Sequence, residues 1–193
     1  YCAWPALPLF LNLWIIPMKI IPTALPGVLI IEPQVFGDAR GFFLESFHSA
    51  RYAEAGITLP FVQDNHSRSQ RHVLRGLHMQ RTHPQGKLVS VSRGAIVDVT
   101  VDINPHSATF GEHITVELND ENHRQLWIPP GYAHGFCVLS AMADMHYKCT
   151  ALYDPKDETG VIWNDPEVNI AWPTDTPLLS AKDQQLPRLR DLR

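Results

Sequence analysis

The sequence has 193 residues, 45% of them apolar and 19% charged, and its formal net charge is −4 with histidine neutral. These values indicate one globular domain with a sizeable core and exclude a disordered chain. Proteins that grip nucleic acid usually present a basic face, and no run of lysine or arginine suggests one, so we expect no nucleic-acid partner. One anionic small molecule requires only a few local cations, and the net charge does not exclude it.

Residues 1–17 differ in composition from the rest of the chain. They hold no charged side chain, and Pro5, Pro8 and Pro17 interrupt them. A membrane-spanning helix needs about 20 apolar residues, and the prolines interrupt this segment before that length. A secretory signal carries a basic segment and a small-residue cleavage site, and neither is evident here. We therefore expect no membrane association. We interpret the segment as a leader that is extraneous to the domain; the alternative is an extension that packs on a partner subunit. The domain itself is expected over 18–193, with an irregular C-terminal arm from about residue 173.

Short runs of Val, Ile, Leu, Phe and Thr, bounded by Gly, Pro, Asn and Asp, follow one another along the domain. The clearest helix is expected at 49–55, with Ser49 as its cap and Gly56 at its end. Regularly spaced short strands favour an all-β fold, and we expect a cupin-like jelly-roll β-sandwich or barrel with a few short helices. The strands are predicted, in chain order, at 28–31, 42–47, 73–77, 88–91, 95–101, 113–118, 125–128, 134–139 and 145–152.

The cysteines are sparse and odd in number. Cys2, Cys137 and Cys149 form no CxxC pair, which argues against zinc-ribbon and redox motifs. The count favours reduced thiols in a cytoplasmic protein. Cys137 and Cys149 each lie in an apolar run, and we expect both to be buried and inert.

The ten histidines do not form a zinc pattern, because neither HExxH nor paired cysteine ligands are present. Metal-binding cupins usually carry two nearby histidines and a glutamate on one strand and a further histidine on a later strand. Here Met79 and Gln80 follow His78, so the neighbouring histidine is missing, while His134 remains in the later segment. We therefore predict a cupin-like barrel without a metal.

A series of sequence blocks makes the resemblance specific. In this order they are similar to those of the dTDP-4-dehydrorhamnose 3,5-epimerase family, and they cover nearly everything from residue 18 to 183. The blocks are 36–46 (FGDARGFFLES), 61–67 (FVQDNHS), 74–78 (LRGLH), 85–89 (QGKLV), 124–129 (RQLWIP), 133–136 (AHGF), 147–148 (YK), 163–166 (WNDP) and 179–183 (LSAKD).

The resemblance implies a reaction. The family inverts carbons 3 and 5 of dTDP-4-dehydro-6-deoxy-D-glucose to give dTDP-4-dehydro-L-rhamnose, a step of dTDP-L-rhamnose biosynthesis that supplies carbohydrates such as lipopolysaccharide O-antigen. Hydrogens on both carbons lie beside a ketone and are weakly acidic. Each inversion needs a base on one face, a donor for the enolate oxygen and an acid on the other face. The resemblance further implies a cytoplasmic homodimer that needs no cofactor.

The same resemblance assigns the catalytic residues. His78 is the expected base, since a neutral imidazole has a pKa near the working pH, and Asp183 is its expected partner. Tyr147 is the expected acid on the opposite face. Lys87 and Arg75 are expected to stabilise the enolate, as fixed cations do in an oxyanion hole. The competing interpretations are a structural histidine, a core tyrosine and ordinary surface charges.

The remaining matches are expected to bind the dTDP-sugar substrate. Arginine and lysine suit the diphosphate, amides suit sugar and base edges, and Tyr153 matches an aromatic that stacks on thymine. The expected substrate-binding residues are Arg40, Phe43, Glu45, Gln63, Asp64, Asn65, Arg75, Lys87, His134, Tyr153, Glu158 and Lys182.

Three other functions compete with this interpretation. A relative that inverts one carbon, or a 3,4-keto-isomerase on a related dTDP-4-keto sugar, could use the same His78 base, although Tyr147 favours epimerisation. A metal cupin such as a dioxygenase is disfavoured by the missing second histidine. A non-catalytic sugar-binding domain would not need His78, Asp183, Lys87 and Tyr147 together.

Overall fold

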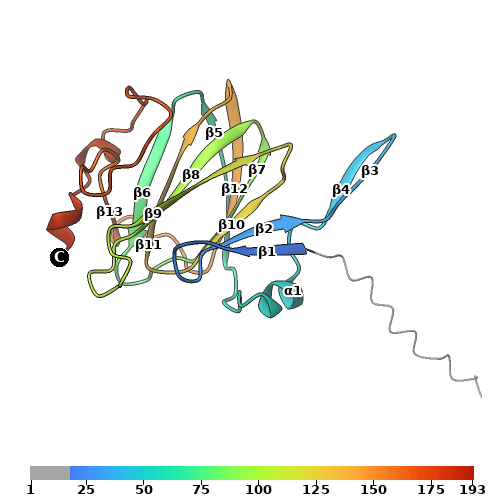
Figure 1. Ribbon diagram of the computed structural model, residues 1–193, viewed down its shortest axis with the longest axis horizontal. Coiled ribbons are helices and arrows are strands. Elements are labelled where there is room, and N and C mark those ends of the chain that lie inside the picture. The colour runs from blue at the N-terminus through green and yellow to red at the C-terminus, as the bar shows by residue number, and fades with distance from the viewer. Residues whose placement is uncertain (1–17) are drawn as a thin grey trace, which may run out of the picture.

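The computed structural model describes residues 18–193, and these form two facing β-sheets (Figure 1). The first sheet has six strands, in the spatial order β1 (Met18–Pro22), β2 (Leu29–Pro33), β10 (Gln125–Ile128), β7 (Lys87–Arg93), β12 (Met142–Cys149) and β5 (Gln63–Gln70). The second has five, in the order β13 (Glu158–Gly160), β6 (Leu74–Gln80), β11 (Tyr132–Val138), β8 (Ala95–Asp102) and β9 (His113–Asn119). The strand pairs within both sheets are antiparallel, and the expected all-β, cupin-like sandwich is confirmed.

A separate hairpin extends from the body of the sandwich. It pairs β3 (Val35–Asp38) with β4 (Gly41–Leu44) and projects away from both sheets (Figure 1). The predicted strand at 42–47 therefore ends earlier, at Leu44. Phe36, Phe42 and Phe43 are exposed at its surface.

Apolar side chains fill only part of the space between the sheets. The main core joins the two sheets through residues such as Val89, Leu126 and Met145 from one sheet and Ile96 and Phe136 from the other. Burying such side chains stabilises the fold by about 1.5–3 kcal/mol each. The rest of the space between the sheets holds the polar cavity described below.

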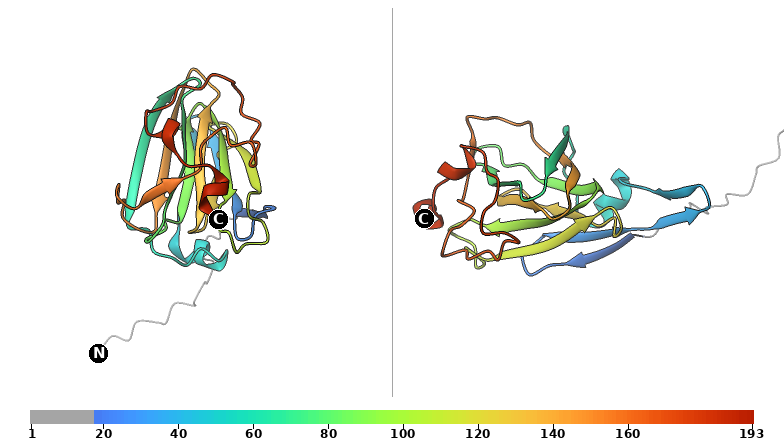
Figure 2. Two further views of the ribbon diagram at one scale, coloured as in Figure 1. Left: turned by 90° about the vertical axis from the view of Figure 1, so that its left-hand side faces the viewer. Right: turned by 90° about the horizontal axis from the view of Figure 1, so that it is seen from above.

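The outer face of the five-stranded sheet is also covered. Val99 and Val101 on β8 pack with Leu189 of the C-terminal arm. The arm contains two short 3₁₀ helices, η1 (Asp183–Gln185) and η2 (Leu189–Leu192), and lies along this face in both views of Figure 2. Because successive strand residues point to opposite faces, Asp98 and Thr100 on β8 point to the inside of the sandwich.

The one α-helix of residues 18–193, α1 (Ser49–Glu54), packs on the outer face of the six-stranded sheet. The expectation that Ser49 caps it is wrong: His48 is the N-cap residue, and its side chain makes no capping hydrogen bond. Gly56 follows the helix end as expected, with a φ of 90° and its N–H donating to the carbonyl of Ala53 at 2.9 Å. Tyr52 anchors the helix, because its buried hydroxyl donates to Gln125 Oε1 at 2.7 Å.

Further expectations concern the N-terminal segment, the cysteines and membrane-spanning helices. The interpretation of 1–17 as a leader lies outside the described residues. Cys137 and Cys149 are buried free thiols, as expected. Among residues 18–193, no helix combines the length and the apolar character that crossing a bilayer requires.

Candidate active site

A cavity of about 580 Å³ opens between the two sheets, and most of the expected catalytic and binding residues line it. The five-stranded sheet contributes β6, β11 and β13, the six-stranded sheet contributes β5, β7 and β12, and the arm adds η1. The expected residues that line the cavity are Arg75, His78, Lys87, His134, Tyr147, Tyr153, Glu158, Lys182 and Asp183.

Glycines allow β6 to lie close to both of its neighbours at this point. A Cβ on Gly135 of β11 would lie 2.6 Å from the carbonyl oxygen of Arg75, and one on Gly160 of β13 would overlap the carbonyl oxygen of Leu77. This close approach places His78 directly opposite His134, its register partner on β11. Two imidazoles therefore share one wall of the cavity.

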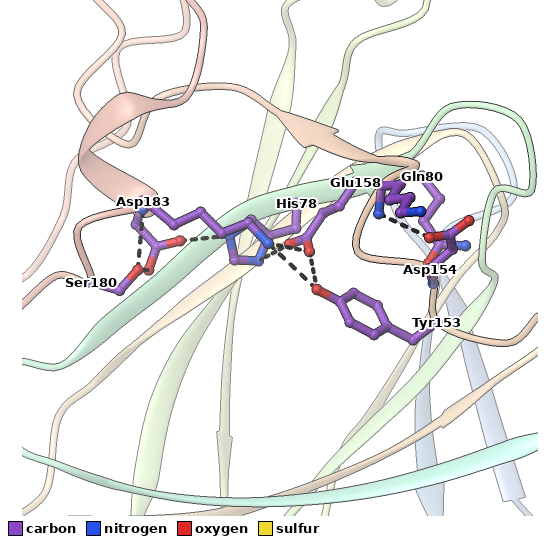
Figure 3. A network of polar contacts seen from close by, with 9 residues as sticks. His78, Gln80, Tyr153, Asp154, Glu158, Ser180 and Asp183 are labelled. Atoms are coloured by element: carbon purple, nitrogen blue, oxygen red, sulfur yellow. Dashed lines mark hydrogen bonds and ion pairs between the residues drawn. The ribbon is translucent and has the colours of Figure 1, made fainter.

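His78 lies between two carboxylates, as Figure 3 shows. Its Nε2 is 2.6 Å from Asp183 Oδ1, and its Nδ1 is 3.5 Å from Glu158 Oε1. Ser180 donates to the other Asp183 oxygen at 2.8 Å. Burial raises the pKa of Asp183, but the hydrogen bonds from His78 and Ser180 outweigh burial and leave that pKa below its usual value. The carboxylate is therefore charged at neutral pH and accepts the Nε2 proton, which leaves Nδ1 as the nitrogen that can take a proton.

Two further side chains form polar contacts with Glu158. The Tyr153 hydroxyl donates to its Oε2, and the Lys182 ammonium forms an ion pair with the same oxygen. Burial raises the pKa of Glu158, but the hydrogen bonds from Lys182 and Tyr153 lower it further than burial raises it. A charged Glu158 near Nδ1 can stabilise the imidazolium that forms when His78 accepts a proton.

A second histidine–carboxylate pair lies deeper in the wall. His134 Nε2 is 2.8 Å from Asp98 Oδ2, and both side chains are buried. Burial lowers the pKa of His134, an effect that Asp98 opposes. A neutral ring that donates from Nε2 keeps a bare Nδ1, so His134 can accept a hydrogen bond from a substrate hydroxyl. Asp98 was not predicted from the sequence, because it lies within an apolar strand and 36 positions from His134.

Lys87 and Tyr147 occupy the facing wall. Burial lowers the pKa of Lys87, while the negative charges of Asp98 and Glu158 oppose the effect. Burial raises the pKa of the Tyr147 phenol, so the phenol stays protonated at neutral pH. Arg75, at the mouth, donates from Nε to Ser69 Oγ at 3.1 Å. The Ser67 hydroxyl, which was not predicted from the sequence, lines the cavity and has no hydrogen-bond partner among the residues that the structure describes.

Other expected binding residues lie outside this cavity. Asp64 forms an ion pair with Lys148, and Glu45 forms one with Arg51. Arg40 and Phe43 lie on the projecting hairpin. One chain therefore does not bring these four residues to His78.

Gln63 and Asn65 on β5 lie beside the cavity without lining it. Gln63 donates to Asn65 Oδ1 at 3.0 Å and accepts the backbone N–H of Tyr153 at 2.9 Å. Asn65 Nδ2 lies 3.5 Å from the Cys149 sulfur. Gln63 thus reaches the cavity through Tyr153.

Comparisons with known proteins identify the family of the chain. The model of the dTDP-4-dehydrorhamnose 3,5-epimerase family matches residues 22–191. The dTDP-4-dehydrorhamnose 3,5-epimerase of Shigella flexneri is 54% identical over 168 residues, which cover 86% of this chain and 93% of that protein. A crystal structure of dTDP-6-deoxy-D-glucose-3,5-epimerase from Legionella pneumophila, in complex with dTDP-4-keto-L-rhamnose, has a TM-score of 0.88 at 53% identity and covers 90% of this chain and 94% of that one.

The chain is also similar to a relative that is named for epimerisation at carbon 3 alone. The dTDP-4-dehydrorhamnose 3-epimerase of Streptomyces niveus is 42% identical over 178 residues, which cover 91% of this chain and 86% of that protein. The fold and the matches define an enzyme of the cupin-like class, with a polar cavity between its sheets. The matches specify it further: the chain belongs to the dTDP-4-dehydrorhamnose 3,5-epimerase family and is an isomerase.

Proposed function

We propose that the chain epimerises carbons 3 and 5 of dTDP-4-dehydro-6-deoxy-D-glucose to give dTDP-4-dehydro-L-rhamnose, in dTDP-L-rhamnose biosynthesis. One observation carries the proposal: His78 and Tyr147 line one cavity from two facing sheets. Inversion requires removal of a proton on one face of the sugar and delivery on the other. A base and an acid on opposite walls meet this requirement without moving the sugar.

His78 is the base of this scheme. With Nε2–H held by Asp183 at 2.6 Å, the free Nδ1 takes the proton from carbon 3 or carbon 5. The C–H electron pair passes into the carbon–carbon bond beside the ketone, and the ketone oxygen becomes the enolate oxygen. Asp183 and Glu158 stabilise the imidazolium that results. Such a positioned base contributes about 10²–10⁴-fold to a rate.

Tyr147 is the acid, and Lys87 and Arg75 stabilise the enolate. The raised pKa of Tyr147 keeps the phenol protonated until it donates to the enolate carbon from the far wall. In this scheme Lys87 acts as a cation in a half-buried position, where its interaction with developing negative charge is stronger than in water. Each inversion moves one proton onto His78 and one off Tyr147, so the total is unchanged. Before the next inversion His78 releases its proton to solvent and Tyr147 takes one from solvent.

The hairpin residues fit this function in a homodimer. Arg40 and Phe43 project away from their own cavity on a hairpin with exposed phenylalanines. We place them at the nucleotide end of the partner's cavity, which would bury Phe43 and bring the guanidinium to the diphosphate. The buried free thiols of Cys137 and Cys149 suit the cytoplasm, where we place the enzyme.

We also propose that the reaction needs no metal. The residues that follow His78 on β6 are Met79 and Gln80, and the Gln80 amide already bonds to backbone groups. Treatment with a strong chelator followed by dialysis should leave kcat unchanged. Loss of activity that one added metal restores would overturn this part of the proposal.

Incubation with dTDP-4-dehydro-6-deoxy-D-glucose in deuterated water, followed by NMR of the sugar, tests the function. We expect deuterium and inverted configuration at both carbons. Label and inversion at carbon 3 alone would instead make the chain a single-carbon epimerase, the activity named for the Streptomyces niveus relative. A ketone moved to carbon 3 would establish a keto-isomerase.

A further inference from the structure

We propose that Gln80 is a positioning residue that holds Tyr153 at the cavity and thereby sets the affinity for the nucleotide part of the substrate. Gln80 lies two residues after His78 on β6, so both side chains point to the same face. It lines the cavity but is only 2% exposed. Its amide is engaged with the backbone of neighbouring loops and not with the cavity space.

The contacts of this amide surround Tyr153. Gln80 Nε2 donates to the carbonyl of Leu152 at 3.2 Å and to that of His83 at 2.7 Å. Its Oε1 accepts the N–H of Asp154 at 2.8 Å. Leu152 and Asp154 are the two chain neighbours of Tyr153, and Figure 3 shows the Gln80–Asp154 contact beside the Tyr153 ring. One buried side chain thus fixes the backbone on both sides of this tyrosine.

Tyr153 has little else to hold it. Half of its surface is exposed, and it belongs to none of the apolar clusters of the described chain. Its remaining anchors are polar: its N–H donates to Gln63, its hydroxyl donates to Glu158, and that hydroxyl accepts from Lys182 Nζ at 3.5 Å. Without Gln80, the carbonyls of Leu152 and His83 and the N–H of Asp154 would lose their hydrogen-bond partner. The loop that carries Tyr153 would then no longer be ordered before the ligand binds.

The inference rests on the proposed role of Tyr153 in binding the nucleotide. An unanchored loop must be ordered when dTDP binds, and this ordering weakens affinity. His78 is held independently, by the pairing of β6 with β11 and by Asp183. Loss of Gln80 should therefore raise KM and the Kd of dTDP far more than it lowers kcat.

Gln80→Leu tests the inference, with Gln80→Met, which keeps the side-chain length, as a second variant where the first does not fold. Calorimetric titration with dTDP should give a Kd about tenfold or more above that of the unmodified protein, which is the loss expected for one or two net hydrogen bonds. The KM should rise in parallel, and kcat should stay within about threefold.

A double-mutant cycle identifies the route of the effect. If Gln80 acts through Tyr153, then Gln80→Leu should change the Kd of dTDP less than about twofold in a Tyr153→Ala background. Asp102→Ala is the matched control, because Asp102 is 3% exposed and holds another loop by accepting from Ser107 at 2.5 Å, Thr109 at 2.6 Å and Asn104 at 3.0 Å. It should lower the Tm and leave the Kd unchanged.

The measurements distinguish failure of the Gln80 inference from failure of the proposed role of Tyr153. An unchanged Kd in Gln80→Leu, when Tyr153→Ala does weaken dTDP binding, overturns this inference alone. An unchanged Kd in Tyr153→Ala overturns both the inference and the proposed role of Tyr153. Independent, additive effects of the two substitutions also overturn the inference, because Gln80 would then act elsewhere.

Discussion

At the residue scale, burial in the cavity shifts the pKa of each ionisable side chain in a direction that depends on its type. Burial lowers the pKa of Lys87 and raises that of Tyr147. Asp183 is also buried, yet its two hydrogen bonds keep it ionised. One wall of the cavity therefore holds both a lysine that gives up its proton more readily than an exposed lysine and a phenol that keeps its proton longer.

Lys87 leads to a pH prediction. A lysine with a lowered pKa is charged below that pKa and neutral above it, so enolate stabilisation should fade before the pH reaches the ordinary value of 10.5. Tyr147 stays protonated over this range and does not cause the loss. The measured kcat should thus fall on the alkaline side below pH 10.5. Lys87→Gln should lower kcat by about 10²–10³-fold at neutral pH.

Lys87→Arg is the control for this assignment. A guanidinium stays charged over the whole accessible range, so the alkaline fall should disappear even if the larger side chain lowers kcat. An identical alkaline fall in Lys87→Arg would show that another group titrates.

The residue scale also shows what sequence could not supply. His78 and Asp183 are 105 positions apart, and only the family resemblance paired them. The contact of Glu158 with His78 and that of Asp98 with His134 depend on strand pairing and register, which one sequence does not reveal. The histidine–carboxylate network could therefore be predicted only where the family motifs name its members.

At the element scale, most apolar strands were predictable, although β1 with the sequence MKIIP was missed, and polar strands were not predictable. Runs of branched apolar residues gave β7 to β11 at about the right places. β5, with the sequence QDNHSRSQ, was missed because its inward residues lie beside a polar cavity and not in a core. β12 was predicted at 145–152, but its pairing ends at Cys149, where the chain turns toward Tyr153.

Close strand packing at β6 gives a stability prediction. A Cβ on Gly160 would overlap the backbone of Leu77, which cannot move without breaking the β13–β6 pairing. Gly160→Ala should therefore reduce the free energy of unfolding by about 2–3 kcal/mol in denaturant titrations. In Gly37→Ala, the nearest atom would be 3.9 Å away, and we expect a change within about 0.5 kcal/mol. Equal stabilities of the two variants would contradict the packing argument.

At the scale of the whole molecule, the hairpin is the part that the single chain leaves unexplained. The sequence assigned Arg40 and Phe43 to the substrate, and the fold places them away from the cavity of their own chain. A second copy reconciles the two observations. Light scattering should therefore give twice the chain mass at micromolar concentration.

Mixed dimers test which cavity the hairpin serves. One chain carries His78→Asn, and the other carries Arg40→Ala with Phe43→Ala; each alone should be nearly inactive. After the two variants are unfolded and refolded together, a mixed dimer contains one chain of each variant. In that dimer, the chain with the altered hairpin keeps His78 and receives an intact hairpin from its partner, so one cavity is complete. The mixture should then recover about a quarter of the unmodified activity. No recovery would mean that each hairpin serves its own chain.

The central claim is that His78 and Tyr147 act on opposite faces of the sugar. The most direct measurement compares His78→Asn and Tyr147→Phe in deuterated water, with NMR following deuterium incorporation and inversion separately. His78→Asn should abolish both, by at least about 10²-fold. Tyr147→Phe should still exchange hydrogen for deuterium, because His78 can form the enolate and return a proton to the same face, but it should make much less inverted product. Equal loss of exchange and inversion in a well-folded Tyr147→Phe protein would contradict the account.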